Sequence, residues 1–362
     1  MTGSGAVRLL IAWGTVALFM LFGPLIFAQA SGLTGVAIFV WLLGTIMWSA
    51  FGVVHEAEEL ADILGEPLGT LVLTLSIVLI EVALIGAVML GDGGPTLGRD
   101  TMFAVLMIVL NGVVGLGLLV GGLRYHVQRY NFQGATSYLA VILPLAVIAL
   151  ILPNYTRSTP GGTLSSWQAA AFSAFTVVLY GTFLKLQTGP HREFFVMDGE
   201  EDPDPDPRPV QWRAVGMHTL LLLASVLPVV LLAKQLAKML DIGIKALDAP
   251  PALGGVLIAL IVFTPEGLAA MRAVSLNKLQ RTINLCLGAA ASTIGLTVPA
   301  ILGISVATSQ DIVLGLAPAE MVLLILTLVL NLLTFTSPRT TALHGATHLV
   351  VFFVYITLIF QP

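Results

Sequence analysis

The feature that most constrains this chain is a series of eleven apolar runs, each about long enough to cross the hydrocarbon core of a bilayer as a helix. The runs lie near residues 8–28, 34–54, 67–90, 100–123, 137–153, 166–187, 214–236, 252–274, 282–304, 317–336 and 342–360. Strands of a membrane barrel would instead alternate between apolar and polar residues. The sequence therefore predicts an all-α polytopic membrane protein with eleven transmembrane helices.

The composition excludes several other classes of protein. Hydrophobic residues make up 57% of the chain and charged residues 10%, whereas a soluble protein has roughly 25% charged residues. The net charge of -4 leaves no basic surface for nucleic acid. The single cysteine, Cys286, excludes a disulfide framework and a site built from several thiolates.

The distribution of Lys and Arg predicts the orientation in the membrane. If the N-terminus is cytoplasmic, 11 of the 16 basic residues lie on the cytoplasmic side, which is the favoured arrangement. The first apolar run lacks a convincing small-residue cleavage site, so we expect a membrane helix there rather than a signal peptide. We expect a multi-pass protein of the plasma membrane, which in bacteria is the inner membrane.

Two carboxylates lie in the middle of apolar runs, Glu81 in the third and Glu266 in the eighth. An ionisable group at the centre of a bilayer costs about 2.5–3.5 kcal/mol, so each is expected to face a cavity or a partner. The alternative for each is a protonated, hydrogen-bonded structural glutamate.

The segments that follow the two acids are alike. After Glu81 come a turn, Arg99 and a run that contains Asn111; after Glu266 come a turn, Arg281 and a run that contains Ser292. The eighth run comes five runs after the third, and five is an odd number. The two segments that contain the carboxylates therefore cross the membrane in opposite directions. Inverted repeats with a binding site near the midplane are typical of secondary transporters.

A proline beside one acid adds backbone oxygen to this pattern. Pro265 has no amide N–H, so the carbonyl about one turn earlier, around Ile261, is freed beside Glu266. Carbonyls and two carboxylates together suit calcium, which takes 6–8 oxygen ligands. Because burial disfavours a charged carboxyl, protons and a cation would compete for the same oxygens, and that competition alone gives exchange. A simple proline kink is the alternative.

These residues resemble a known family. The segments Gly65-Glu-Pro-Leu-Gly69 leading into Glu81, and Pro265-Glu-Gly267 through Asn277-Lys-Leu-Gln280 to Gly295-Leu-Thr-Val-Pro299, are similar to the two repeat motifs of calcium/proton antiporters. The resemblance is to the bacterial ChaA type within the cation/calcium exchanger superfamily. It implies one extra helix (residues 1–30), a first five-helix repeat (31–187), an acidic cytoplasmic linker (188–213) and a second five-helix repeat (214–362).

The resemblance also implies a site. Glu81 and Glu266 would be the metal ligands and the shared carriers of cation and protons. The backbone carbonyls of Ile77 and Val262 would be further ligands, with Asn111 and Ser292 as polar residues of the following helices. Accessory positions are Glu58, Glu59, Asn277 and Gln280. We expect no cofactor, calcium ions and protons as the transported substrates, and the lipid bilayer as the surroundings of the chain; the oligomeric state stays open.

The sequence departs from the pattern of vacuolar-type relatives at three places. Ile77 and Val78 stand where those relatives have Gly-Asn, Gly267 stands where a His is frequent, and Ser292 stands where a Gln is frequent. The site therefore has fewer side-chain oxygens. Exchange of sodium or potassium for protons remains the alternative to exchange of calcium.

Two weaker features have open interpretations. The stretch His55-Glu-Ala-Glu-Glu59 is either a solvated helix end or a place for cation uptake or pH sensing. His344 and His348 are four residues apart on one helix face, which favours a packing or hydrogen-bonding role. Neither a mid-membrane Asp nor a catalytic serine motif is present, so the chain is not expected to be an intramembrane hydrolase or any other enzyme.

Overall fold

The structure is a computed structural model that describes residues 3–65, 68–89, 94–197, 211–250, 252–308 and 312–361. Ten helical segments among these residues are long and apolar enough to cross a bilayer, and α3 contains a shorter apolar stretch, Leu71–Gly86. Together they match the eleven apolar runs. The prediction of an all-α polytopic membrane protein is confirmed. The acidic run 198–207 of the predicted linker, and Glu66 and Pro67 of the first motif, lie outside the described residues.

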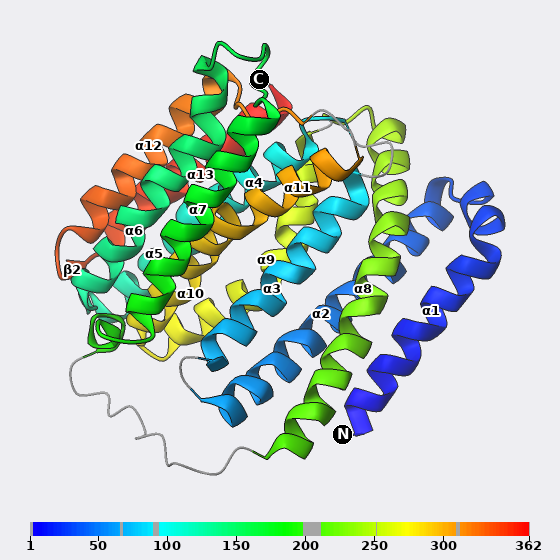
Figure 1. Cartoon of the computed structure of the whole chain (residues 1–362), viewed down its shortest axis with the longest axis horizontal. Coiled ribbons are helices and arrows are strands. Elements are labelled where there is room, and N and C mark those ends of the chain that lie inside the picture. The colour runs from blue at the N-terminus through cyan, green and yellow to red at the C-terminus, as the bar shows by residue number, and fades with distance from the viewer. Residues whose placement is uncertain are drawn as a thin grey trace. The chain divides into compact units, whose positions relative to one another are not determined.

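The elements in chain order are α1 (Gly3–Ala28), α2 (Gly32–Leu64), α3 (Leu68–Met89), α4 (Leu97–Met107), η1 (Ile108–Val113), α5 (Val114–Tyr125), β1 (Gln128–Arg129), α6 (Phe132–Ala146), η2 (Val147–Ile151), η3 (Leu152–Tyr155), α7 (Ser166–Gln187), η4 (Arg192–Phe195), α8 (Trp212–Ala246), α9 (Ala252–Ser275), α10 (Leu279–Ser292), η5 (Thr293–Thr297), α11 (Val298–Thr308), α12 (Pro318–Phe335), β2 (Arg339–Thr340) and α13 (Ala342–Phe360). Figure 1 shows most of them with their labels.

Two helices extend well past the apolar runs that predicted them. α2 continues from residue 54 to Leu64, and α8 continues from residue 236 to Ala246. The added residues are mostly Ala, Glu, Leu, Lys and Ile, which tolerate a helix well. Gly65, with a φ of 65°, ends α2 in a backbone conformation that favours glycine. The stretch His55 to Glu59 therefore lies inside a helix rather than beyond its end.

The chain forms two compact units, and each takes segments from both halves of the sequence. Unit 1 consists of residues 1–97 and 205–265, and unit 2 of residues 98–204 and 266–362. The predicted repeats describe the order of helices along the chain, so this spatial grouping does not test them. α9 passes from unit 1 to unit 2 between Pro265 and Glu266.

Unit 1 is built around α2, which packs against α1, α3 and α8. Leu42, Ile46, Val53 and Ala57 are buried at helical spacing along α2. α2 and α8 lie side by side and run in opposite directions (Figure 1). Many apolar side chains of these helices face outward, as expected for helices that contact lipid.

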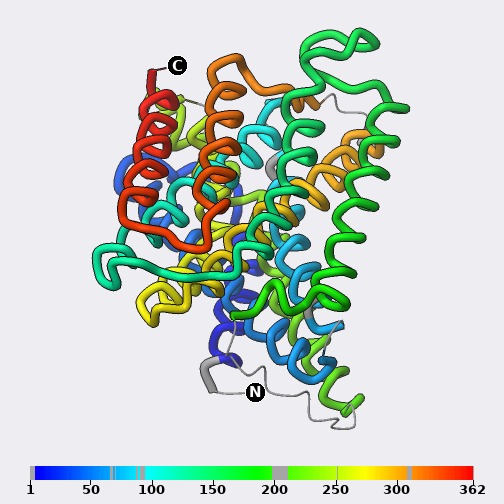
Figure 2. The backbone as a smooth tube through the Cα atoms, turned by 90° about the vertical axis from the view of Figure 1, so that its left-hand side faces the viewer, coloured from blue at the N-terminus to red at the C-terminus, as the bar shows by residue number. Residues whose placement is uncertain are grey.

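Unit 2 contains a helix pair that packs through glycine. α5 lies along α13, and a Cβ at Gly345 would overlap with the backbone of Gly115 and Leu119. Small residues at such an interface let two membrane helices approach closely. β1 and β2 form a short antiparallel pair that joins the ends of the same two helices, with Gln128 opposite Thr340. α12 and α13 lie side by side in Figure 2.

Candidate functional site

Three carboxylates are buried among the described residues, and two of them are the predicted pair. Glu81 is 2% exposed and lies in the middle of α3, in unit 1. Glu266 is 7% exposed and lies just past the middle of α9, in unit 2. The third is Glu56, on α2. Within the described residues, no three His, Cys, Asp or Glu side chains form a cluster that could hold a metal ion.

The helix that contains Glu266 stays continuous past a proline that directly precedes this residue. α9 runs from Ala252 to Ser275 with Pro265 inside it. In a helix the carbonyl of Ile261 faces the amide of residue 265, and a proline has no N–H to donate. This carbonyl, and not that of Val262, lacks its helical donor. In unit 2 the fully buried Cys286 of α10 lies close enough to Glu266 for an electrostatic interaction.

Asn111 lies in η1, a π-helical segment between α4 and α5, and is fully buried. Its Nδ2 donates to Thr327 Oγ1 at 2.7 Å, and its Oδ1 lies 3.1 Å from His348 Nδ1. Because an amide oxygen only accepts, Nδ1 of His348 carries the proton. A cation at Asn111 Oδ1 would have to replace this hydrogen bond. Both ends of the amide are engaged within unit 2.

The network around Asn111 includes one of the two predicted histidines. His348 Nε2 is 2.9 Å from Thr334 Oγ1, and Asn331 Nδ2 donates to the Thr327 carbonyl at 2.8 Å. His348, Thr327 and Asn331 are all fully buried. The expectation of a hydrogen-bonding role for His348 agrees with this arrangement, which joins η1, α12 and α13.

Ser292 occupies the corresponding place in the second half of the chain. It is the last residue of α10, directly before the π-helical segment η5, and its hydroxyl donates to the Ala289 carbonyl at 3.0 Å. Both helices that follow a carboxylate helix thus change to π-helix at their middle polar residue. Such segments are frequent at functional sites because the wider turn displaces backbone groups. Nothing in the composition of either run predicted the change.

The accessory residues Asn277 and Gln280 hold the turn between α9 and α10. Asn277, with a φ of 60°, accepts from Gln128 Nε2 at 3.1 Å. Gln280 accepts from the backbone N–H of Asn131 at 2.8 Å and donates to Asn284 Oδ1 at 2.9 Å. Asn277 is eleven residues beyond Glu266, or about 16 Å along a helix. These contacts give both residues a structural role in unit 2.

The acidic stretch of α2 contains a buried residue that sequence analysis missed. Glu58 is exposed and Glu59 is partly exposed, whereas Glu56 is 6% exposed. Glu56 Oε2 lies 2.8 Å from His218 Nδ1 of α8, and Glu56 Oε1 lies 3.8 Å from Arg8 Nη2 of α1. The sequence offered one hint, since Glu56, Gly52 and Ser49 follow one face of α2 at helical spacing.

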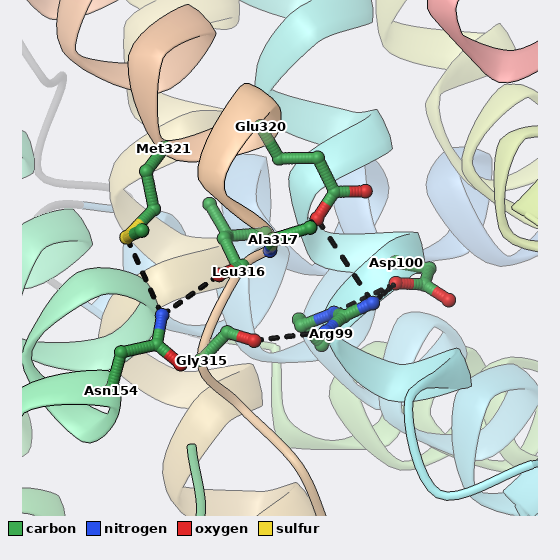
Figure 3. Close-up of polar contacts among 8 residues, drawn as sticks. All are labelled: Arg99, Asp100, Asn154, Gly315, Leu316, Ala317, Glu320 and Met321. Carbon is green, nitrogen blue, oxygen red and sulfur yellow. Dashed lines mark hydrogen bonds and ion pairs between the residues drawn. The ribbon is translucent and has the colours of Figure 1, made fainter. Parts of the chain in front are cut away.

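A second charged cluster joins helix ends within unit 2 (Figure 3). Arg99 forms an ion pair with Asp100 at 2.7 Å, donates to the Gly315 carbonyl at 2.8 Å and lies 4.0 Å from Glu320. Glu320 accepts from the Ala317 N–H at 2.9 Å, which caps the first turn of α12.

Asn154 donates to the Leu316 carbonyl at 2.8 Å in the same cluster, and a Cβ at Gly315 would overlap with its side chain. Its contacts fix the loop before α12.

The comparisons with known proteins agree with this architecture. A sequence profile described as sodium/calcium exchanger protein matches residues 34–189 and 217–361. The chain belongs to this family. It is 39% identical over 330 residues to the sodium-potassium/proton antiporter ChaA of Escherichia coli, with 90% of this chain and 89% of that one covered. It is 41% identical over 317 residues to a putative ionic transporter, y4hA, of Sinorhizobium fredii, with 87% and 86% covered.

Solved structures of exchangers share the fold. The structure of native YfkE aligns with a TM-score of 0.73 at 16% identity and covers 98% of this chain and 100% of that one. The H+/Ca2+ exchanger CAX aligns with a TM-score of 0.67 at 13% identity and covers 98% and 89%. Family members are cation transporters, so the expectation that the chain is a multi-pass ion transporter is confirmed at that level.

Proposed function

We propose that this exchanger moves calcium ions in one direction and protons in the other by alternating access, with Glu81 and Glu266 as the shared carriers. The observation that carries the proposal is the burial of both carboxylates in the middle of apolar helices. A bare carboxylate is costly there, so each group favours a protonated or a cation-bound form. A carboxyl group that alternates between those two forms exchanges a cation for protons.

The backbone supports a role in binding calcium. Pro265 leaves the Ile261 carbonyl without a helical donor one turn from Glu266. Calcium accepts carbonyl oxygens and tolerates irregular geometry. The solved structures that share the fold include the Ca2+/H+ antiporter YfkE and the H+/Ca2+ exchanger CAX. We include Ile77, Val262, Asn111 and Ser292 as further candidates for binding, and two inverted five-helix repeats as the framework.

The second candidate is exchange of sodium or potassium for protons. The ChaA protein, whose name states that activity, is far more similar in sequence than the calcium exchangers are. The shortage of side-chain oxygens near the acids also favours a monovalent ion, because calcium wants more oxygen ligands. In both cases we place the N-terminus in the cytoplasm and the protein in the plasma membrane.

The test is proton flux in proteoliposomes driven by calcium, sodium or potassium. We expect calcium to collapse an imposed proton gradient in the wild type, and Glu81→Gln and Glu266→Gln each to abolish the flux. Glu193→Gln, which makes the same change at an exposed position, should keep it. A response to sodium or potassium alone would leave the carriers in place and transfer the substrate to the second candidate. Full exchange by either carrier variant would refute the mechanism.

A further inference from the structure

The interface of α1, α2 and α8 in unit 1 contains polar groups that the proposed exchange does not use. Glu56 of α2 is bound by His218 of α8 and faces Arg8 of α1. The Arg8 guanidinium lies over Gly52, where a Cβ would overlap with it, and its Nε has no protein hydrogen-bond partner within the described residues. The cluster is at the end of unit 1 where α1 and α8 begin and α2 ends.

Two buried hydroxyl groups lie deeper in the same interface, beyond the cluster of Arg8, Glu56 and His218. Ser49 and Ser225 are 2% and 1% exposed, and neither hydroxyl has a protein partner within the described residues. Buried polar groups are nearly always hydrogen-bonded, and where protein supplies no partner a buried water does. The two hydroxyls therefore indicate bound water at the α2–α8 interface.

The geometry of the two helices places both serines at the same depth. Ser49 is seven residues before Glu56, and Ser225 is seven residues after His218. Seven residues are close to two helical turns, so each serine lies on the face of its charged neighbour, about 10 Å deeper. Because α2 and α8 run in opposite directions and contact each other at Glu56 and His218, both serines lie at the same level.

That level is also the level of Glu81. Gly69 of α3 lies against the backbone of Ala61 in α2. Twelve residues separate Ala61 from Ser49, and twelve separate Gly69 from Glu81. The two helices are consecutive and antiparallel, so Ser49 and Glu81 lie at matching depth, about 18 Å from this contact. α3 packs against both α2 and α8.

We propose that the α1–α2–α8 interface of unit 1 is a hydrated proton route that begins at Glu56 and His218 and passes Ser49 and Ser225 to the level of Glu81. Each water or hydroxyl along it accepts one proton and releases another, so no charge remains on the serines. The charged groups that face it are Arg8 from α1, Glu56 from α2 and His218 from α8, with Glu81 from α3 at its inner end. The proposal rests on the proposed function, exchange of a cation for protons by this chain.

The first experiment tests hydration and is independent of transport. In a Cys286→Ala background, Ser49→Cys and Ser225→Cys are reconstituted, exposed to silver ions, then denatured and alkylated. We expect silver to block alkylation of both thiols. Thr15→Cys is the matched control, because the Thr15 hydroxyl is buried in the same unit but donates to the Ile11 carbonyl and accepts from Trp41. Protection of Ser49→Cys and Ser225→Cys no greater than that of Thr15→Cys would overturn the proposal.

The second experiment tests proton delivery. We expect the double variant Ser49→Ala, Ser225→Ala to slow cation-driven proton flux by about tenfold, since a positioned proton-transfer group contributes at least that much. Its KM for the cation should be unchanged and the loss should grow as protons become scarce at high pH. Two alanines leave an apolar space, which does not hold water. Thr15→Val should behave as wild type.

A wild-type rate for the double variant at every pH would refute the route. Absence of proton flux in the wild type would instead refute the proposed function, and the silver experiment would still test the water-filled interface.

Discussion

The two units bury polar side chains in different ways. The cluster in unit 1 is charged, with Arg8, Glu56 and His218 in contact, and the serines beyond it have no protein partner within the described residues. The network in unit 2 joins Asn111, Thr327, Thr334 and His348 through amide, hydroxyl and imidazole groups. A network whose groups bond one another fixes the positions of helices. A charged cluster with spare hydroxyls can take up water and protons.

Removal of Glu56, the carboxylate that contacts both Arg8 and His218 in unit 1, should have the largest effect on stability. Glu56→Ala leaves the Arg8 and His218 side chains largely buried without their carboxylate. We expect the free energy of unfolding to fall by about 3 kcal/mol, as for other broken buried pairs. Unfolding in mixed detergent micelles measures this. Glu58→Ala, on the exposed face of the same helix, should change it little, and equal effects of the two substitutions would contradict the contacts seen here.

Removal of the Asn111 amide, at the centre of the network in unit 2, should lower the free energy of unfolding by less. Asn111→Leu removes the amide that donates to the Thr327 hydroxyl and accepts from His348 Nδ1, and we expect a loss of about 2 kcal/mol in the free energy of unfolding.

Asn331→Leu is the matched control for this change. Asn331 is as buried as Asn111, but its Oδ1 has no protein partner within the described residues. Replacement of an amide with an unmet acceptor should be nearly neutral. A cost for Asn331→Leu as large as that for Asn111→Leu would show that amide volume, and not hydrogen bonding, holds the network.

A smaller change isolates one bond of the network. Thr334→Val keeps the shape of the side chain and removes the hydroxyl that faces His348 Nε2. We expect the free energy of unfolding to fall by about 1 kcal/mol. Combined with Asn111→Leu, the loss should be less than the sum, because both substitutions act on His348. Strictly additive losses in the double variant would show that the two hydrogen bonds of His348 contribute independently.

The weakest effect is expected at the rim of unit 2. Glu320→Gln removes a charge that lies 4.0 Å from Arg99 and is partly exposed. Its amide oxygen can still accept from the Ala317 N–H. We expect the free energy of unfolding, measured by thermal unfolding, to fall by less than about 0.5 kcal/mol, the usual range for exposed ion pairs. A loss of several kcal/mol would contradict this expectation and would show that the pair of Arg99 and Glu320 behaves as a buried ion pair.

The sequence predicted the features that follow from hydrophobic length. Within the described residues, ten of the apolar runs correspond to helices long and apolar enough to cross a bilayer, and the remaining run corresponds to the shorter apolar stretch of α3. The cost of a charge in the bilayer identified Glu81 and Glu266 as buried acids. Helix ends were less predictable, because α2 and α8 continue with charged residues that a helix tolerates. The site predictions for binding itself stay predictions.

Contacts between distant segments were not predictable from local pattern. Glu56 stands in a stretch of exposed acids, and its partner His218 is 162 positions away on another helix. The same holds for Asn111 and His348. The π-helical segments η1 and η5 have no signature in propensity, since their residues are those of an ordinary membrane helix.

The pairing of α5 with α13 has a consequence for biosynthesis. Asn111 and His348 are 237 positions apart, and the glycines of α5 are covered by a helix near the end of the sequence. At ordinary rates of translation the first partner is made roughly 10 to 50 s before the second. During that interval the amide of Asn111 and the glycine face of α5 must be shielded by lipid, by earlier helices or by the insertion machinery. A ribosome that stops before α13 releases a protein whose second unit cannot close.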